Sequence, residues 1–455
     1  MKKTKLFIVV LLVALVAMGS VFAAGSAESA AKGQVLRVAA FKGAYGDAFW
    51  APLVAEFEAQ NPGVTVEIEA SPNLEDVIRP QIMTGEGPDV IYLATGREKA
   101  LTETLMADRA MVDLTDLLDT QVPGENATLR EKILPGFLDT NATNPYGDGR
   151  TYMLPLFYSA NGLFYNADLF NTDGSDGKYK LPETWADFLA LKGELDKFNA
   201  GKNDAEKRYL LSYARAGYMD NFIIAAVASS AGIDVMNEFL NYEDVYGNPE
   251  FVRVFEAMAD IKGNFYMPAV DNATPYLDNQ NALLQNRALF LPCGSWIFGE
   301  MADYTPATGF KYGYTAPFAF EHGDDRYAVA MMEQVYVLKQ SKNQDLAKKF
   351  LAFLYSDKAV EIIARDAQGI VPTVNAVEIA RSTGAMDDQS LSVYEIFSTG
   401  VKPAIGQFAS ASVENVNWKQ TFCFTMNACM KGEKTAADWV NAMKTDASKL
   451  RAALN

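Results

Sequence analysis

Histidine and cysteine are scarce in this chain of 455 residues, and each scarcity excludes a class of site. The one histidine, His322, cannot build a histidine-rich zinc site, and no serine or cysteine nucleophile signature lies near it. The three cysteines, Cys293, Cys423 and Cys429, are an odd number, which excludes a complete disulfide framework. Cys423 and Cys429 are too far apart on a predicted helix to bridge, whereas Cys293 could pair with either. We favour buried free thiols for all three, because unpaired cysteine is usually buried.

Positive charge is also in short supply. Lysine and arginine number 40 against 57 aspartates and glutamates, which gives a formal net charge of −17. Nucleic acids and anionic membranes both require a positive surface, so neither is expected as a partner. No P-loop and no GxGxxG motif follows a predicted strand, and no complete metal-ligand pattern occurs. We therefore expect neither a cofactor nor a metal.

Long apolar runs are missing except at the start of the chain. Lysines among the first five residues precede an uninterrupted apolar run over residues 6–16, and residues 21–24 are mostly small. This pattern predicts a cleaved secretory signal over residues 1–23; an uncleaved anchor would need about 20 apolar residues. No cysteine lies there to carry a lipid, so we expect an exported protein of a periplasm.

The part that follows shows strands alternating with helices. Residues 35–41, 64–70 and 90–94 have the apolar or alternating patterns of strands, and helical spacing of apolar residues lies between them. This βαβ order predicts an α/β fold with a parallel sheet, and the length predicts two domains. Ligands bind beyond the carboxyl ends of such strands, which points to the loops at residues 42–47 and 94–97.

Residues 151–166 predict a crossing between two domains. Two apolar runs meet there at a small, polar break, residues 159–162, and Pro155 indicates an edge or a bend. We expect Phe157 and Tyr158 to stand at the wall of a cleft between the domains, where small ligands bind.

Six segments occur in an order that carries a resemblance: FEAQNPGVTVEIEAS, TGEGPDVIYLA, YMLPLFYSANGLFYN, LPETWADFLAL, ALFLPCGSWIFGEMA and AKKFLAFLYSDKAVEII. The chain resembles the family 1 extracellular solute-binding proteins of ABC transporters, the maltose-binding-like group, from about residue 33 almost to the end. The resemblance implies an α/β, two-lobed periplasmic binding protein of type II, each lobe a sheet flanked by helices. It further implies a monomeric carrier rather than an enzyme, with an inner-membrane ABC permease as its partner.

The same resemblance implies where the lobes divide. The chain would cross three times, near residue 156, near residues 331–334 and after residue 377. The N-terminal lobe would comprise residues 33–155 and 333–378, and the C-terminal lobe residues 156–332 and 379–455. Three crossings form a hinge, so that a ligand touching both lobes stabilises the closed form.

Aromatic and polar residues supply candidates for a sugar site, because a pyranose offers an apolar face and many hydroxyls. Trp185 and Trp439 lie in amphipathic helices and are expected to pack, whereas Trp50, Trp296 and Trp418 are candidate stacking platforms. By family position Trp296 is the strongest of the three. The other candidates share predicted cleft segments: Asp47, Thr95, Phe157, Tyr158, Asn161, Ser295, Glu333 and Gln334.

The hypothesis is a carrier of a mono- or oligosaccharide, and the overall pattern is closest to carriers of N-acetylglucosamine and its oligomers. Two alternatives stay open. The same fold could hold a polyol, a peptide or an opine. An exported glycoside hydrolase would need two carboxylates across the scissile bond, for which Glu300 and Glu333 could be proposed, although no local signature pairs them.

Overall fold

A computed structural model describes residues 33–43, 45–97, 99–171, 177–212, 219–266 and 275–454. The predicted signal segment, residues 1–23, lies outside the described residues. Within the described ranges, none of the helices has the length and apolar character needed to cross a bilayer.

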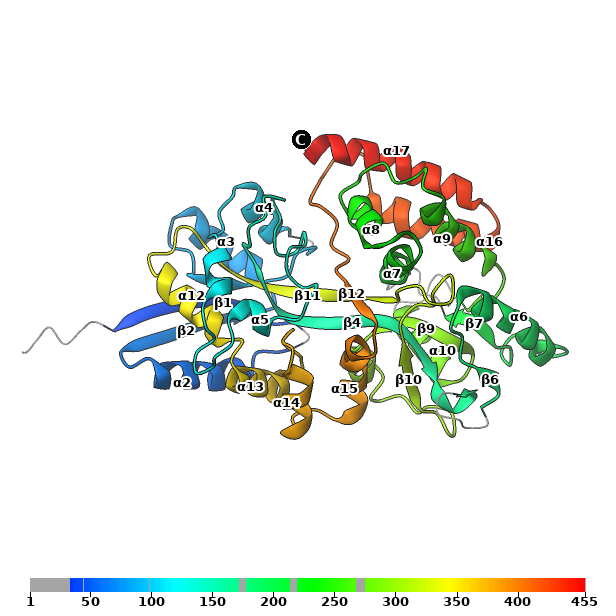
Figure 1. Ribbon diagram of the computed structural model, residues 1–455, viewed down its shortest axis with the longest axis horizontal. Coiled ribbons are helices and arrows are strands. Elements are labelled where there is room, and N and C mark those ends of the chain that lie inside the picture. The colour runs from blue at the N-terminus through cyan, green and yellow to red at the C-terminus, as the bar shows by residue number, and fades with distance from the viewer. Residues whose placement is uncertain are drawn as a thin grey trace, which may run out of the picture.

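The strands and helices alternate along most of the chain (Figure 1). The strands are β1 (Gln34–Phe41), β2 (Val64–Ser71), β3 (Val90–Tyr92), β4 (Leu154–Asn166), β5 (Phe170–Asn171), β6 (Tyr179–Lys180), β7 (Tyr209–Ser212), β8 (Phe265–Tyr266), β9 (Ala288–Gly294), β10 (Tyr312–Thr315), β11 (Tyr327–Val337) and β12 (Lys402–Ala404). The helices are α2 (Trp50–Gln60), α3 (Leu74–Met83), α4 (Leu101–Ala107), α5 (Leu129–Lys132), α6 (Trp185–Asn199), α7 (Met219–Ala231), α8 (Ile233–Leu240), α9 (Pro249–Asp260), α10 (Pro275–Leu284), α11 (Ile297–Glu300), α12 (Gln344–Phe353), α13 (Asp357–Ala367), α14 (Ala376–Ser382), α15 (Asp388–Tyr394), α16 (Thr425–Lys431) and α17 (Ala436–Leu454).

One sheet runs through the whole molecule. Its strand order is β2-β1-β3-β11-β4-β9-β7-β8, with β10 on β4 and β12 on β11. β1 is parallel to β2 and β3, as the βαβ pattern predicts, whereas β11 is antiparallel to both β3 and β4. Figure 1 shows β4 and β11 side by side, extending from the half that holds β1 and β2 into the half that holds β7 and β9. The α/β, two-lobed architecture predicted from the sequence is thereby confirmed.

The N-terminal elements form where the sequence predicts them. β1 and β2 begin and end within one residue of the predicted strands, and α2 ends immediately before the Asn-Pro-Gly turn, where Gly63 has a φ of 88°. In β1, Leu36, Val38 and Ala40 face one apolar cluster and Ala39 faces another. Both faces of β1 are thus covered, which explains why β1 reads as a nearly continuous apolar run, whereas β2 alternates and leaves Thr65 and Glu67 exposed.

The polar residues at 159–162 do not interrupt the strand that crosses between the halves. β4 continues through Ser159, Ala160, Asn161 and Gly162 without interruption, and all 13 of its residues are buried. The polar positions are tolerated because they are hydrogen-bonded: the Asn161 side-chain amide donates to the carbonyl oxygens of Ser159 and Val329.

Pro155 lies at the one irregularity of the β4–β11 pairing. Phe157 pairs with Glu333 and Pro155 with Gln334, so that the register shifts by one residue between them. Proline lacks the N–H of a regular ladder and is accommodated at such bulges. The bend expected at Pro155 is therefore present as a change of register.

The apolar interior is divided between the two halves. One cluster joins β1, α2, α12 and α13, and another joins α6, α7, α9 and α17. Trp185 and Trp439 are 4% and 0% exposed within the second cluster, in agreement with their predicted packing role. Cys293, Cys423 and Cys429 are buried and free, as favoured from the sequence.

The boundaries between the lobes stay a prediction. The crossings expected near residues 156 and 331–334 fall on β4 and β11, which extend through both halves. Ala380, Leu391 and Tyr394, which lie beyond the predicted boundary at residue 378, pack with the cluster of the N-terminal half. By packing, α14 and much of α15 therefore belong with that half.

Candidate functional site

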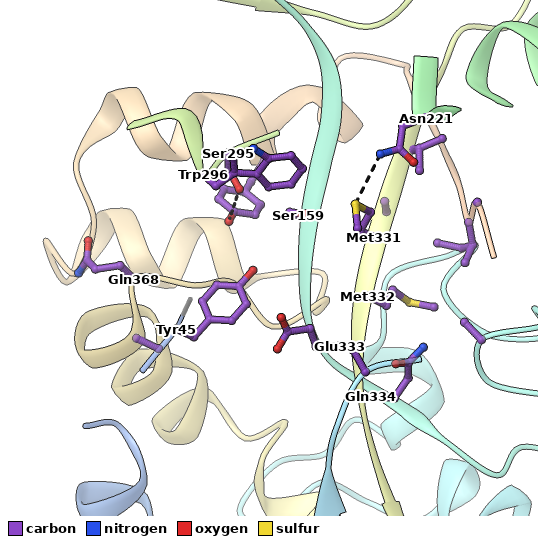
Figure 2. Close-up of a pocket in the computed structure, with 18 of the residues that line it drawn as sticks. Tyr45, Ser159, Asn221, Ser295, Trp296, Met331, Met332, Glu333, Gln334 and Gln368 are labelled. Carbon is purple, nitrogen blue, oxygen red and sulfur yellow. Dashed lines mark hydrogen bonds between the residues drawn. The ribbon is translucent and has the colours of Figure 1, made fainter. Parts of the chain in front are cut away.

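A cavity of about 760 Å³ opens where β4 and β11 pass from one half to the other (Figure 2). Its volume lies in the range of about 300–1,000 Å³ that is usual for small-molecule sites. The described lining residues are Tyr45, Ala94, Thr95, Ala142, Ser159, Asp220, Asn221, Ser295, Trp296, Phe298, Gly299, Glu300, Val329, Ala330, Met331, Met332, Glu333, Gln334, Ala367, Gln368, Met386, Ser390, Tyr394, Ile405, Gly406 and Gln407. They come from both halves, so a solute in the cavity would contact both.

β11 lines more of the cavity than any neighbouring strand. Every residue from 329 to 334 contributes, whereas β4 contributes Ser159 alone. In a strand successive side chains point to opposite faces, so six consecutive lining residues mean that both faces of β11 contribute to the cavity. The register shift between Glu333 and Gln334 leaves the extra residue, Leu156, on β4.

Glu333 is half-buried, and its carboxylate is held by a hydrogen bond from a residue of β3. The Tyr92 hydroxyl donates to its Oε2 atom, and Figure 2 shows the carboxylate directed toward Tyr45. Burial raises the pKa of Glu333, although the Tyr92 hydrogen bond and the charge of Arg97 oppose that shift. The group is thus an acceptor poised for a hydroxyl or an ammonium of a ligand.

Aromatic rings form one side of the cavity. The Tyr45 ring stacks on Phe157 with centroids 4.1 Å apart and an interplanar angle of 9°, so the ring is held in place from behind. Trp296 follows the tight turn at Gly294, and Figure 2 shows Trp296 on the same side of the strands as Tyr45. Ser295 Oγ and Tyr394 OH lie 3.1 Å apart beside Trp296. Rings fixed in this way can receive an apolar ligand face at little entropic cost.

Amide and hydroxyl groups form the other side. Asn221 Nδ2 donates to Asn161 Oδ1 at 3.3 Å and to the Met331 sulfur at 3.5 Å. The Thr95 amide N–H donates to Gln334 Oε1 at 3.2 Å, and Thr95 Oγ1 donates to Gln407 Oε1 at 2.9 Å. The side chains of this wall are therefore oriented before any ligand arrives.

Five of the predicted site residues line the cavity: Thr95, Ser295, Trp296, Glu333 and Gln334. Their contact with a ligand stays a prediction. The glycine turn before Trp296 pointed to Ser295 and Trp296, the end of β3 pointed to Thr95, and the crossing implied by the resemblance pointed to Glu333 and Gln334.

Trp50, Phe157, Tyr158 and Asn161 do not line the cavity. Trp50 is 2% exposed and contacts the rings of Phe49 and Tyr92. Phe157 and Tyr158 are buried in the core, and Phe157 serves as the backing of the Tyr45 ring. Asn161 accepts the hydrogen bond of Asn221 and so supports the wall from behind. We leave these four out of the proposed ligand contacts.

Asp47 and Trp418 also lie outside the cavity lining. Asp47 forms an ion pair of 2.9 Å with Lys42 on the exposed loop after β1. Trp418 belongs to an aromatic cluster of the C-terminal half, where it contacts Phe239, Phe408 and Phe422. Because its ring packs against this cluster, we leave Trp418 out of the proposed ligand contacts.

Sequence reasoning missed several lining residues. Tyr45 lies in the loop at residues 42–47 that was expected at the cleft, so its position could have identified it. Asn221, Tyr394 and Gln407 lie on two helices and a late loop that come to the cavity only through the tertiary fold. Their local sequence carries no signal for this role.

The described residues contain no group of three histidine, cysteine, aspartate or glutamate side chains that could hold a metal. Glu300 and Glu333 both line the cavity, and Glu300 accepts a hydrogen bond from Gln280 Nε2. The arrangement is that of a binding site with stacking surfaces, acceptors and amides.

Comparisons with known proteins show similar sequences and a shared fold. The chain is 22% identical over 325 residues to the multiple sugar-binding protein of Streptococcus mutans, which covers 69% of this chain and 70% of that one. It is 25% identical over 340 residues to a binding protein of Brucella abortus, covering 72% and 74%. The apo form of RafE from Streptococcus pneumoniae shares the fold with a TM-score of 0.67 at 17% identity, over 92% of this chain and 98% of that one.

The family comparison covers most of the chain. Residues 52–386 match the model of the bacterial extracellular solute-binding proteins. That range includes β4, β11 and most of the cavity lining. The resemblance inferred from the six ordered segments is thereby confirmed: the chain belongs to the bacterial extracellular solute-binding protein family.

Proposed function

We propose that the protein captures a mono- or oligosaccharide between its two lobes and delivers it, as a monomer in the periplasm, to an inner-membrane ABC importer. The observation that carries the proposal is the cavity itself. Tyr45 and Trp296, from opposite halves, line it together with Glu333 and Asn221. Rings beside hydrogen-bonding groups match the apolar face and the hydroxyls of a pyranose.

The similarity to a multiple sugar-binding protein supports a carbohydrate over other solutes. An affinity near micromolar would require about 8 kcal/mol, which stacking and several hydrogen bonds can supply on closure. A polyol, a peptide or an opine would use the same amides, but none of them needs two aromatic platforms. The carbohydrate is therefore the preferred ligand class.

We prefer the carrier role to the glycoside hydrolase alternative. The family consists of solute-binding proteins, and stacking platforms with amides are sufficient for capture. The purified protein can be assayed for hydrolysis of an aryl glycoside. Hydrolysis that is lost in both Glu300→Gln and Glu333→Gln would support the glycoside hydrolase instead.

A titration tests the proposal directly. Intrinsic tryptophan fluorescence is measured against a panel of neutral, amino and acidic mono- and oligosaccharides, with polyols, peptides and opines in parallel. We expect a saturable change with at least one sugar, because Trp296 lines the cavity. X-ray scattering on the same sample should show a smaller radius of gyration. Binding to a non-sugar alone would overturn the carbohydrate assignment.

A further inference from the structure

We propose that the cavity accepts sugars that are uncharged or carry an amine and rejects those with a carboxylate, sulfate or phosphate. This inference rests on the proposed sugar-carrier function and names the class of sugar. It follows from the charges that line the cavity.

All the charged groups among the described lining residues are acidic. Asp220, Glu300 and Glu333 line the cavity, and no lysine or arginine appears in the described lining. Moving an anion into this partly desolvated space would bring like charges together, with no basic side chain in the described lining to neutralise them. The −17 charge of the full chain adds a repulsive field outside the cavity.

The basic groups near these acids are mostly engaged elsewhere. Arg97, whose charge acts on Glu333, has its Nε 2.5 Å from Glu75 Oε1 and its guanidinium 3.7 Å from the centre of the Phe41 ring. Lys419 acts on Asp220 from an exposed position outside the lining. Neither side chain is among the cavity lining, so neither is placed to bind an anionic ligand.

Glu333 is the group best placed to discriminate. Tyr92 fixes one of its oxygens, and the carboxylate is directed toward Tyr45, where a stacked ring would lie. A sugar hydroxyl or ammonium can donate to this acceptor, and hydrogen bonds to a charged acceptor are the stronger kind. An anionic substituent at the same place would meet an acceptor instead of a donor.

The test uses matched probes and a matched variant. Disaccharides of glucose, glucosamine and glucuronic acid, in α-1,4 and β-1,4 linkage, are titrated calorimetrically into the full mature protein. We expect the glucose or glucosamine form to bind at least about tenfold more tightly than the glucuronic acid form, because like charges repel at short range. In Glu333→Gln this ratio should fall several-fold.

Glu67→Gln is the control, because it removes the same charge from an exposed position on β2. It should leave the ratio unchanged; an equal fall in both variants would assign the selectivity to overall charge and overturn the role of the cavity. Asp220→Asn serves in the same assay if Glu333→Gln does not fold. Equal or tighter binding of the glucuronic acid form would overturn this inference and leave the sugar-carrier proposal intact. Silence toward all six probes, with a non-sugar bound in the panel, would remove the sugar-carrier proposal and this inference with it.

Discussion

The two strands that pass between the halves differ in what they present. β4 is buried at every position, whereas β11, its hydrogen-bonded neighbour, leaves Met331 48% exposed and Glu333 half-buried. Aromatic residues on β4 pack inward, and β11 carries the polar and thioether groups of the cavity. One strand thus supports the fold and the other displays the chemistry, although both cross at the same place.

The largest effect should come from removing a β4 side chain. Phe157→Ala deletes a fully buried ring that contacts Tyr45 and Phe49, and we expect a loss of about 3–5 kcal/mol in the free energy of unfolding. Urea denaturation measures the loss. Met331→Ala on β11 should change stability by less than about 0.5 kcal/mol, because its side chain is largely exposed. Equal losses in the two variants would contradict the proposed difference between β4, which supports the fold, and β11.

A second variant extends the comparison to β9, the other neighbour of β4. A Cβ at Gly294 would lie 2.3 Å from the Trp296 ring, so Gly294→Ala must displace that ring. We expect ligand affinity to fall at least about tenfold, because the stacking face is lost. The control is Gly193→Ala on α6, outside the cavity lining, whose Cβ would meet no neighbouring atom within 4 Å. Calorimetry should show weaker ligand binding in Gly294→Ala and unchanged binding in the control. Unchanged affinity in Gly294→Ala would contradict a role for Trp296 in the site.

The third prediction concerns the cost of placing a carboxylate on β11. Because folding raises the pKa of Glu333, its contribution to stability is present below the ordinary value of 4.5 and is lost as pH rises through the raised pKa. Glu333→Gln does not titrate, so its stability relative to the wild type should increase with pH over that window. Urea midpoints between pH 4 and 8 measure the difference.

Met331→Gln is the control for this experiment, since it places an amide two positions away without removing an ionisable group. Its difference from the wild type should stay constant with pH. A difference for Glu333→Gln that is equally constant would contradict the burial of the carboxylate.

The smallest effect is expected from breaking a hydrogen bond between two residues that line the cavity. Gln407→Ala removes the acceptor of the Thr95 hydroxyl, a contact between the end of β3 and the segment after β12. The net loss should be about 0.5–1.5 kcal/mol in stability. Scattering without ligand should show a slightly larger radius of gyration than the wild type. Phe408→Leu, which alters the neighbouring aromatic cluster but not this hydrogen bond, should leave the radius unchanged.

Local patterns were sufficient for much of the fold. The apolar run of β1, the alternation in β2 and the Asn-Pro-Gly turn after α2 gave those elements nearly to the residue, because each depends on its own sequence. The sequence could not tell which face of β4 meets the cavity, since both of its faces are covered. Phe157, Tyr158 and Asn161 were therefore expected in the site and belong to its support.

The rest of the site depends on contacts between distant segments. Tyr394 and Gln407 come from a helix and a loop of the last quarter of the chain, and nothing in their neighbourhood marks them as cavity residues. Glu333 and Gln334 were found because family position placed a crossing there. Their place beside the cavity is set by the pairing of β11 with β3 and β4, which are distant in sequence.

The central place of β11 also affects how the chain matures. β3 remains an open sheet edge until β11 arrives, and Thr95 and Gln334, which are joined by a hydrogen bond, lie 239 positions apart. Such distant pairings slow folding. A nascent chain would thus emerge with its first lobe incomplete and stay extended for longer, a state in which a polypeptide bearing the predicted signal can be threaded through a translocation channel before its hinge exists.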